Sequence, residues 1–168
     1  MSCDIKGTLY DYHGGIRDLK KGEIKFIGDS KERIKEDFLR ILRFFRFYAY
    51  YGKKKITQTQ LKIFKNLSKN LKKLSSERIY SEFYQILLSD NQYDVIKLMN
   101  NSGVLKYLIF NDNNIERLKS LNKLIEINHL IDFSTRLAIL MNKKNLNKIS
   151  KNLKFFKDEV FKIKKILS

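Results

Sequence analysis

The chain has 168 residues, which fits one domain or two small ones, and 43% of them are hydrophobic, enough to form a core. Its formal net charge of +17 indicates an anionic partner, either a nucleic acid or an acidic membrane face. Lys and Arg interrupt every apolar run well before the roughly 20 residues that a span needs, so we expect no membrane insertion. The single cysteine, Cys3, excludes an internal disulfide and favours a reducing cytoplasm.

The first 29 residues predict a short β-hairpin. Thr8–Tyr12 and Glu23–Ile27 alternate apolar and polar residues in the manner of short strands. Between them, Gly14 and Gly15 predict a turn, and Ile16–Leu19 is long enough for one helical turn. No G-x-x-x-x-G-K-[ST] pattern follows the two glycines, so we interpret them as a turn and not as a phosphate-binding loop.

A single helix is predicted over Lys31–Tyr51. Asp29 or Ser30 can cap its start, and Gly52 can end it in the left-handed conformation. At about 100° per residue, its apolar residues form a stripe of roughly 120°, the width of a core-facing side. The members of this stripe are Ile34, Phe38, Ile41, Leu42, Phe45, Tyr48 and Ala49.

Four charged residues lie outside that stripe at intervals of three: Asp37, Arg40, Arg43 and Arg46. This spacing makes them a ridge that winds along the predicted helix. A carboxylate and a guanidinium one turn apart suit the edge of a nucleobase, and two further arginines suit phosphates. The alternative is a solvated i,i+3 ion pair with ordinary surface charge around it.

The chain after Gly52 predicts further helices. Thr57 caps the next one, and Ser75 or Ser76 caps a helix in which Arg78 and Glu82 form an i,i+4 pair. The apolar positions of that helix have helical spacing and are predicted to face the core: Ile79, Phe83, Ile86 and Leu87. Shorter helices are predicted over Tyr93–Asn100, Val104–Ile109, Asn114–Ile127 and Phe133–Met141.

The last predicted helix, Leu146–Leu167, is longer, basic and amphipathic. It suits a membrane surface, RNA phosphates, or ordinary packing with a lysine-covered outer side. His13 and His129 have no partners at metal-ligand spacing, and we predict neither a metal site nor a catalytic residue in this chain. The predicted fold class is therefore all-α, multi-helical, with a short N-terminal β-hairpin.

Three ordered stretches resemble one family, the bacterial class II CCA-adding tRNA nucleotidyltransferases and their poly(A) polymerase relatives. The residues from Glu36 to Phe47 read EDFLRILRFFRF, which is similar to the family motif EDxxRxxRxxRF. Asp11 to Leu19 reads DYHGGIRDL and, with the later FIGD ending at Asp29, resembles the segment before that motif. Ser76 to Leu88 reads SERIYSEFYQILL and resembles the family's E-R-h-x-x-E-x-x-x-h-h-h motif.

The resemblance implies roles for eight residues of this chain. In the family, the Asp and first Arg of the motif act as a protein template for the incoming base, which implies this role for Asp37 and Arg40. Arg43 and Arg46 are then expected nearer the sugar and phosphates. The resemblance also implies supporting residues that brace this nucleotide-binding set: Glu36, Glu77, Arg78 and Glu82.

The resemblance further implies three parts. Residues 1–29 correspond to a remnant of the catalytic head, 30–90 to the nucleotide-recognising neck, and 91–168 to an RNA-binding body. The family's head holds two metal ions with paired carboxylates, and no D-x-D, G-G-x-x-R-D or R-R-D pattern precedes Asp11. We therefore expect that the chain alone binds no cofactor and is inactive, with ATP and CTP as substrates and Mg²⁺ held by a head that it lacks.

Three functions stay open at this point. In the first, the chain is the CTP- and ATP-selecting, tRNA-binding portion of a CCA-adding or poly(A)-adding enzyme, and it works with a separately encoded head or is left from a broken gene. In the second, it is a non-catalytic RNA-binding helical module. In the third, which disregards the resemblance, it is a basic helical protein bound to membranes or DNA. We expect tRNA or another RNA as partner, no membrane, and a cytoplasmic location.

Overall fold

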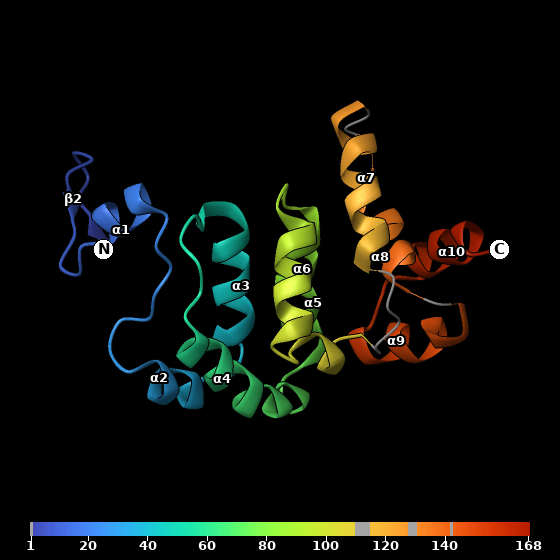
Figure 1. The fold of residues 1–168 in the computed structure, drawn as a ribbon, viewed down its shortest axis with the longest axis horizontal. Coiled ribbons are helices and arrows are strands. Elements are labelled where there is room, and N and C mark those ends of the chain that lie inside the picture. Colours follow the sequence, from blue (N-terminus) through green and yellow to red (C-terminus); the bar gives the residue numbers. More distant parts are fainter. Residues whose placement is uncertain (1, 110–114, 128–130, 142) are drawn as a thin grey trace.

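The structure is a computed structural model that describes residues 2–109, 115–127, 131–141 and 143–168. The helices follow one another along the long axis of the molecule, with the two termini at opposite ends (Figure 1). In the part of the chain that is described, the only sheet is a two-stranded antiparallel one. The predicted all-α fold with a short hairpin is confirmed. No helix among the described residues has the length and apolar character needed to cross a bilayer.

The hairpin pairs β1 (Ser2–Cys3) with β2 (Leu9–Tyr10), and Ser2 lies opposite Tyr10. Asp4 closes the connection, because its carboxylate accepts hydrogen bonds from the backbone amides of Lys6 and Thr8 at 2.9 and 2.8 Å. The prediction that Glu23–Ile27 forms the second strand was wrong. The helical turn predicted at Ile16–Leu19 is confirmed and lies within α1 (Gly15–Lys21).

Residues 23–28, which we call the strap, run without regular structure from α1 to α2 across the outside of α3 (Figure 1). Phe26 of the strap stacks on Phe44 of α3 with ring centroids 5.6 Å apart. Before the strap, the Gly22 carbonyl accepts hydrogen bonds from the amides of Lys53 and Lys54 at 2.8 and 3.1 Å. The strap packs on α3 through an aromatic ring and not through a strand ladder, so the alternating pattern of Glu23–Ile27 could not predict this contact.

Replacing Gly22 by Ala should weaken this attachment. Gly22 has φ of +61°, and an added Cβ would lie 2.5 Å from the Lys53 Cβ and 2.8 Å from the Lys53 amide nitrogen. We expect a left-handed penalty of roughly 1–2 kcal/mol and an overpacking cost of about 1–3 kcal/mol. Gly28→Ala is the matched control, because Gly28 has φ of +86° but no neighbour within 4 Å. Hydrogen exchange of residues 22–29 and urea denaturation measure both variants; equal losses would contradict the close approach.

The single helix predicted over Lys31–Tyr51 was wrong, because the chain forms two helices there. They are α2 (Ser30–Glu36) and α3 (Arg40–Tyr51), and Asp37 between them is extended, with φ −151° and ψ 107°. The Asp37 carboxylate accepts from the Leu39 amide at 3.1 Å, a local bond that competes with helix formation. The Asp29 cap is confirmed by its bond from the Glu32 amide at 2.9 Å.

Gly52 ends α3, but the prediction that it does so in the left-handed conformation was wrong, since its φ is −72°. The next elements are α4 (Gln58–Leu67), the 3₁₀ helix η1 (Ser68–Lys73), α5 (Ser76–Leu88) and α6 (Gln92–Asn101). Thr57 caps α4, as predicted, through a bond from the Gln60 amide at 3.2 Å. The predicted core-facing side of α5 is confirmed, because its four apolar residues are all buried.

The C-terminal part contains η2 (Leu105–Tyr107), α7 (Ile115–Ile127), α8 (Phe133–Leu140), η3 (Lys143–Asn145), α9 (Leu146–Leu153) and α10 (Lys157–Ile166). The predicted start of α7 at Asn114 and His129 lie outside the described residues. The prediction of one long final helix was wrong, because Lys154 is left-handed, with φ 50°, and separates α9 from α10.

The break between α9 and α10 turns Phe155 toward an aromatic cluster. Phe155 lies 5.9 Å from the Tyr80 ring of α5 and 6.3 Å from the Phe133 ring of α8, measured between centroids. Glu159 of α10 accepts hydrogen bonds from the Tyr80 hydroxyl and, at 3.0 Å, from the Phe156 amide. Tertiary packing of these rings therefore overrides the continuous helical pattern.

Candidate functional site

The charged residues of the predicted ridge gather at the junction between α2 and α3, opposite α5. Asp37 is the centre of this junction. One of its carboxylate oxygens accepts from the Leu39 amide, and the other lies 2.8 Å from Arg78 Nη2 of α5 and 4.0 Å from Arg43 Nη1. The carboxylate is therefore held in one orientation by bonds from its own loop and from a helix 41 residues later in sequence.

Arg40 is held by α2 and not by Asp37. Its Nη1 lies 2.9 Å from Glu36 Oε2 and donates to the Arg33 carbonyl at 3.1 Å. Arg33 pairs with the same Glu36 carboxylate at 2.9 Å. The alternative interpretation of the spacing was a solvated ion pair between Asp37 and Arg40. In the structure Asp37 instead pairs with Arg78, and Arg40 pairs with Glu36.

Glu82 of α5 binds the other two arginines. Its two carboxylate oxygens lie 3.1 Å from Arg43 Nε and 2.6 Å from Arg46 Nε. The Glu82 side chain is only 11% exposed, whereas those of Arg43 and Arg46 are 45% and 27% exposed. One nearly buried carboxylate therefore orients two guanidinium groups that still reach solvent.

A hollow of about 250 Å³ lies between this arginine set and the strap. Arg33, Arg40 and Arg43 line it on one side, with Phe44 and Phe47, and Ile24–Ile27 line it on the other. Asp37 and Arg46 do not line this hollow, but both are joined to Arg43, directly at 4.0 Å or through Glu82. The structure therefore joins Asp37, Arg43 and Arg46 through ion pairs, and Arg40, which Glu36 holds, lines the same hollow as Arg43.

Sequence reasoning missed Arg33, Phe47 and the strap as lining residues of this hollow. The available signal was the position of FIGD, which directly precedes the helix and is close enough to fold back on it; helical spacing alone contains no such information.

Two of the predicted supporting residues of α5, Arg78 and Glu82, contact the network. Glu77 does not, and instead pairs with Lys154 at 2.5 Å. The hydrogen bond from Lys154 lowers the pKa of Glu77 below its usual value. Because the shift is downward, this pair is present at neutral pH and is lost as the pH falls through the lowered pKa. The supporting role of these residues stays a prediction.

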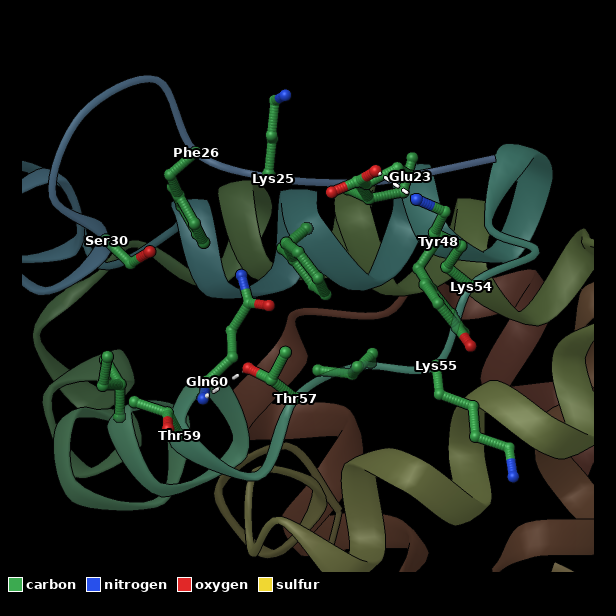
Figure 2. A pocket seen from close by; sticks show the side chains of 14 residues that line it. Glu23, Lys25, Phe26, Ser30, Tyr48, Lys54, Lys55, Thr57, Thr59 and Gln60 are labelled. Atoms are coloured by element: carbon green, nitrogen blue, oxygen red, sulfur yellow. Dashed lines mark hydrogen bonds and ion pairs between the residues drawn. The ribbon is translucent and has the colours of Figure 1, made fainter. Parts of the chain in front are cut away.

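A second hollow, of about 360 Å³, lies on another side of α3, between the strap and the start of α4. Figure 2 shows Phe26 and Tyr48 against it, and the Glu23–Lys54 ion pair, at 2.5 Å, along its upper rim. The hydrogen bond from Lys54 also lowers the pKa of Glu23. These contacts join the strap to the segment before α4. They also position the part of the strap that lines both hollows.

Within residues 2–109, 115–127, 131–141 and 143–168, no group of three or more His, Cys, Asp or Glu side chains is placed to hold a metal ion. The absence of a metal site in the whole chain stays a prediction.

Comparisons with known proteins address the family. Residues 55–110 match a family described as "Probable RNA and SrmB-binding site of polymerase A". The mitochondrial CCA tRNA nucleotidyltransferase 1 of Mus musculus is 36% identical over 129 residues, which are 75% of this chain. The CCA-adding enzyme of Lactococcus lactis subsp. lactis is 36% identical over 111 residues, or 64% of this chain. The resemblance to CCA-adding enzymes is confirmed.

The fold agrees with that relationship. A structure of the Thermotoga maritima CCA-adding enzyme complexed with tRNA matches 93% of this chain with a TM-score of 0.71 and 22% identity. The match includes 41% of the Thermotoga chain. This chain spans 30% of the length of the mouse protein and 27% of the Lactococcus CCA-adding enzyme. In sequence and fold it is therefore similar to one part of these CCA-adding enzymes.

Proposed function

We propose that this chain selects CTP and ATP and binds tRNA as the neck and body of a CCA-adding nucleotidyltransferase, together with a catalytic head. Residues 1–29 contact the head, 30–90 recognise the nucleotide, and 91–168 bind RNA. CTP and ATP are substrates, and the head supplies the carboxylates that hold Mg²⁺ for nucleotidyl transfer. The observation that supports this proposal most strongly is the orientation of Asp37 by Arg78 and the Leu39 amide.

The carboxylate of Asp37 explains how one site selects two bases. An ionised carboxylate accepts hydrogen bonds and donates none. Cytosine and adenine each have an exocyclic amino group that donates, whereas the corresponding groups of uracil and guanine are carbonyl oxygens that accept. Two bonds hold Asp37, and a carboxylate has about four acceptor positions, so positions remain for a base. Arg40, held by Glu36, supplies donors in a fixed plane to the same base edge.

The other two arginines suit the rest of the nucleotide. Arg43 and Arg46 are held at Nε by Glu82, which leaves their terminal nitrogens to bind phosphate oxygens. Because Glu82 fixes both guanidinium groups, less side-chain entropy is lost when a triphosphate binds. We therefore assign base selection to Asp37 and Arg40. Arg43 and Arg46 contribute binding that is common to all nucleotides.

The N-terminal segment supports a contact with a head. Five of its large apolar side chains are more than half exposed: Ile5, Leu9, Tyr12, Leu19 and Ile27. Exposed apolar residues gathered in one segment are typical of a surface that packs against another protein part. The net charge of +17 supports the binding of tRNA phosphates.

Complementation tests the proposed function. The chain is incubated with tRNA lacking its 3′ CCA, with CTP, ATP and Mg²⁺, with and without the head domain of the Lactococcus lactis relative. We expect no addition by the chain alone, and CCA addition by the mixture. The Lactococcus head mixed with its own neck and body is the positive control. Addition by the chain alone would overturn the assignment of catalysis to a head.

A second candidate function is an RNA-binding module without a catalytic partner, which the match of residues 55–110 to an RNA-binding family favours. It predicts tRNA binding by the chain and no addition in the mixture, even when the positive control is active.

A further inference from the structure

A third hollow, of about 780 Å³, lies away from the arginine network, where the end of η1 and the start of α5 meet η2 and α9. Residues of α9 that line it, such as Lys151 and Leu153, lie outside the part of the chain that matches the RNA-binding family. Lys72, Lys106 and Tyr107, which also line it, lie inside that part.

The lining of this hollow is strongly basic. Lys72, Lys106, Lys148 and Lys151 contribute to it, and no Asp or Glu among the described residues does. Glu77, which follows the lining residue Ser76, is already paired with Lys154 at 2.5 Å. Positive charge focused in a concave site attracts anions more strongly than the same charge spread over a convex surface. The hollow therefore favours an anionic ligand.

One aromatic ring lies among these lysines. The ammonium groups of Lys106 and Lys72 lie 5.0 and 5.6 Å from the centroid of the Tyr107 ring. The ring attracts both ammonium groups and so keeps two positive charges near each other. An anion bound between them would offset their mutual repulsion. Tyr107 is half-buried, and Leu74 and Ile79 add apolar surface to the lining.

We infer that this hollow binds one unpaired nucleotide of an RNA chain, with its phosphates on the lysines and its base against Tyr107. Lysines alone would suit any polyanion, but an aromatic ring beside apolar walls suits the face of a base. A base inside a duplex is stacked and cannot enter a concave site, so the ligand is unpaired. The inference rests on the proposed tRNA binding and adds a second contact, separate from the site that selects CTP and ATP.

The first test compares two triple variants of equal net charge. Lys72→Gln, Lys106→Gln and Lys151→Gln together remove charge from the hollow. Lys6→Gln, Lys20→Gln and Lys21→Gln remove the same charge from exposed positions in residues 1–29, outside the proposed RNA-binding part. The probe is a short single-stranded RNA at fixed salt. We expect on the order of a tenfold loss of affinity for the hollow variant, and a loss of about threefold or less for the control.

The second test separates the base from the phosphates. Tyr107→Leu should weaken binding of the single strand by on the order of tenfold, while Tyr107→Phe, which keeps the ring, should stay close to the unaltered chain. A blunt RNA duplex of the same sequence should bind the two variants alike. Circular dichroism confirms that each variant is folded.

The outcomes separate this inference from the proposed function. Equal losses in the two triple variants would overturn the site, and equal binding by Tyr107→Leu and Tyr107→Phe would overturn the base contact. If the unaltered chain restores CCA addition but the hollow variants bind like their controls, only this inference fails. If complementation fails while the hollow variants lose affinity for single-stranded RNA, the proposed function fails and the site stands.

Discussion

Asp37→Asn should relax the choice of nucleotide in the head-complemented reaction, raising incorporation of UTP and GTP relative to CTP and ATP by roughly tenfold to a hundredfold. A base-reading hydrogen-bond pair contributes about 1–3 kcal/mol of discrimination. The amide of Asn presents a donor where Asp presents only acceptors, so it can pair with the carbonyl oxygens of uracil and guanine. The side-chain oxygen of Asn can still accept from the Leu39 amide, so the break between α2 and α3 should persist.

Asp29→Asn is the matched control for this substitution. Asp29 also accepts a backbone amide hydrogen bond, from Glu32, at the start of α2, but none of the ion pairs described for Asp37 and the arginines includes its carboxylate. We expect its nucleotide choice to equal that of the unaltered chain. The measurement is the ratio of kcat/KM values for the four nucleotides on tRNA ending in each intermediate. An Asp37→Asn protein that still rejects UTP and GTP would contradict the base-reading role.

Glu82→Gln should weaken binding of all four nucleotides alike and lower stability. The carboxylate of Glu82 is nearly buried and binds Arg43 and Arg46 at 3.1 and 2.6 Å, whereas a neutral amide has one oxygen that can accept. Because both arginines are partly exposed, solvent screens part of the loss. We expect a fall of roughly 1–3 kcal/mol in the free energy of unfolding and a KM several times higher for CTP and ATP.

Glu77→Gln serves as the control, because Glu77 lies on the same helix and its ion-pair partner, Lys154, is exposed. Its unfolding free energy should change by no more than about 1 kcal/mol, the range of surface ion pairs. Urea denaturation measures stability, and initial rates measure KM. A change in base preference for Glu82→Gln, with KM unaltered, would contradict the division between base-reading and phosphate-binding residues.

Local patterns in the sequence determined much of this fold. The caps at Asp29 and Thr57 and the buried side of α5 were correct, because each depends on residues within one or two helical turns. The order and spacing of three motifs was sufficient to identify the family before any contact was known.

Tertiary structure decided how the functional groups meet. A pattern with helical spacing continued through Asp37 and through Lys154, yet both positions end helices. Intrinsic helix propensities differ by less than about 1 kcal/mol per residue, so long-range contacts can outweigh them. At Asp37 the contact is Arg78, 41 residues later, and beyond Lys154 it is the ring cluster around Phe155.

The same reason explains the arginine network. The sequence placed Asp37 and three arginines on one helix, but the carboxylate that holds Arg43 and Arg46 is Glu82, 39 and 36 residues away. Nothing in local spacing connects an i,i+3 series on one helix to a carboxylate on another. The sequence determined which side chains were charged and available, and the packing of α3 against α5 decided which of them pair and which remain oriented toward a ligand.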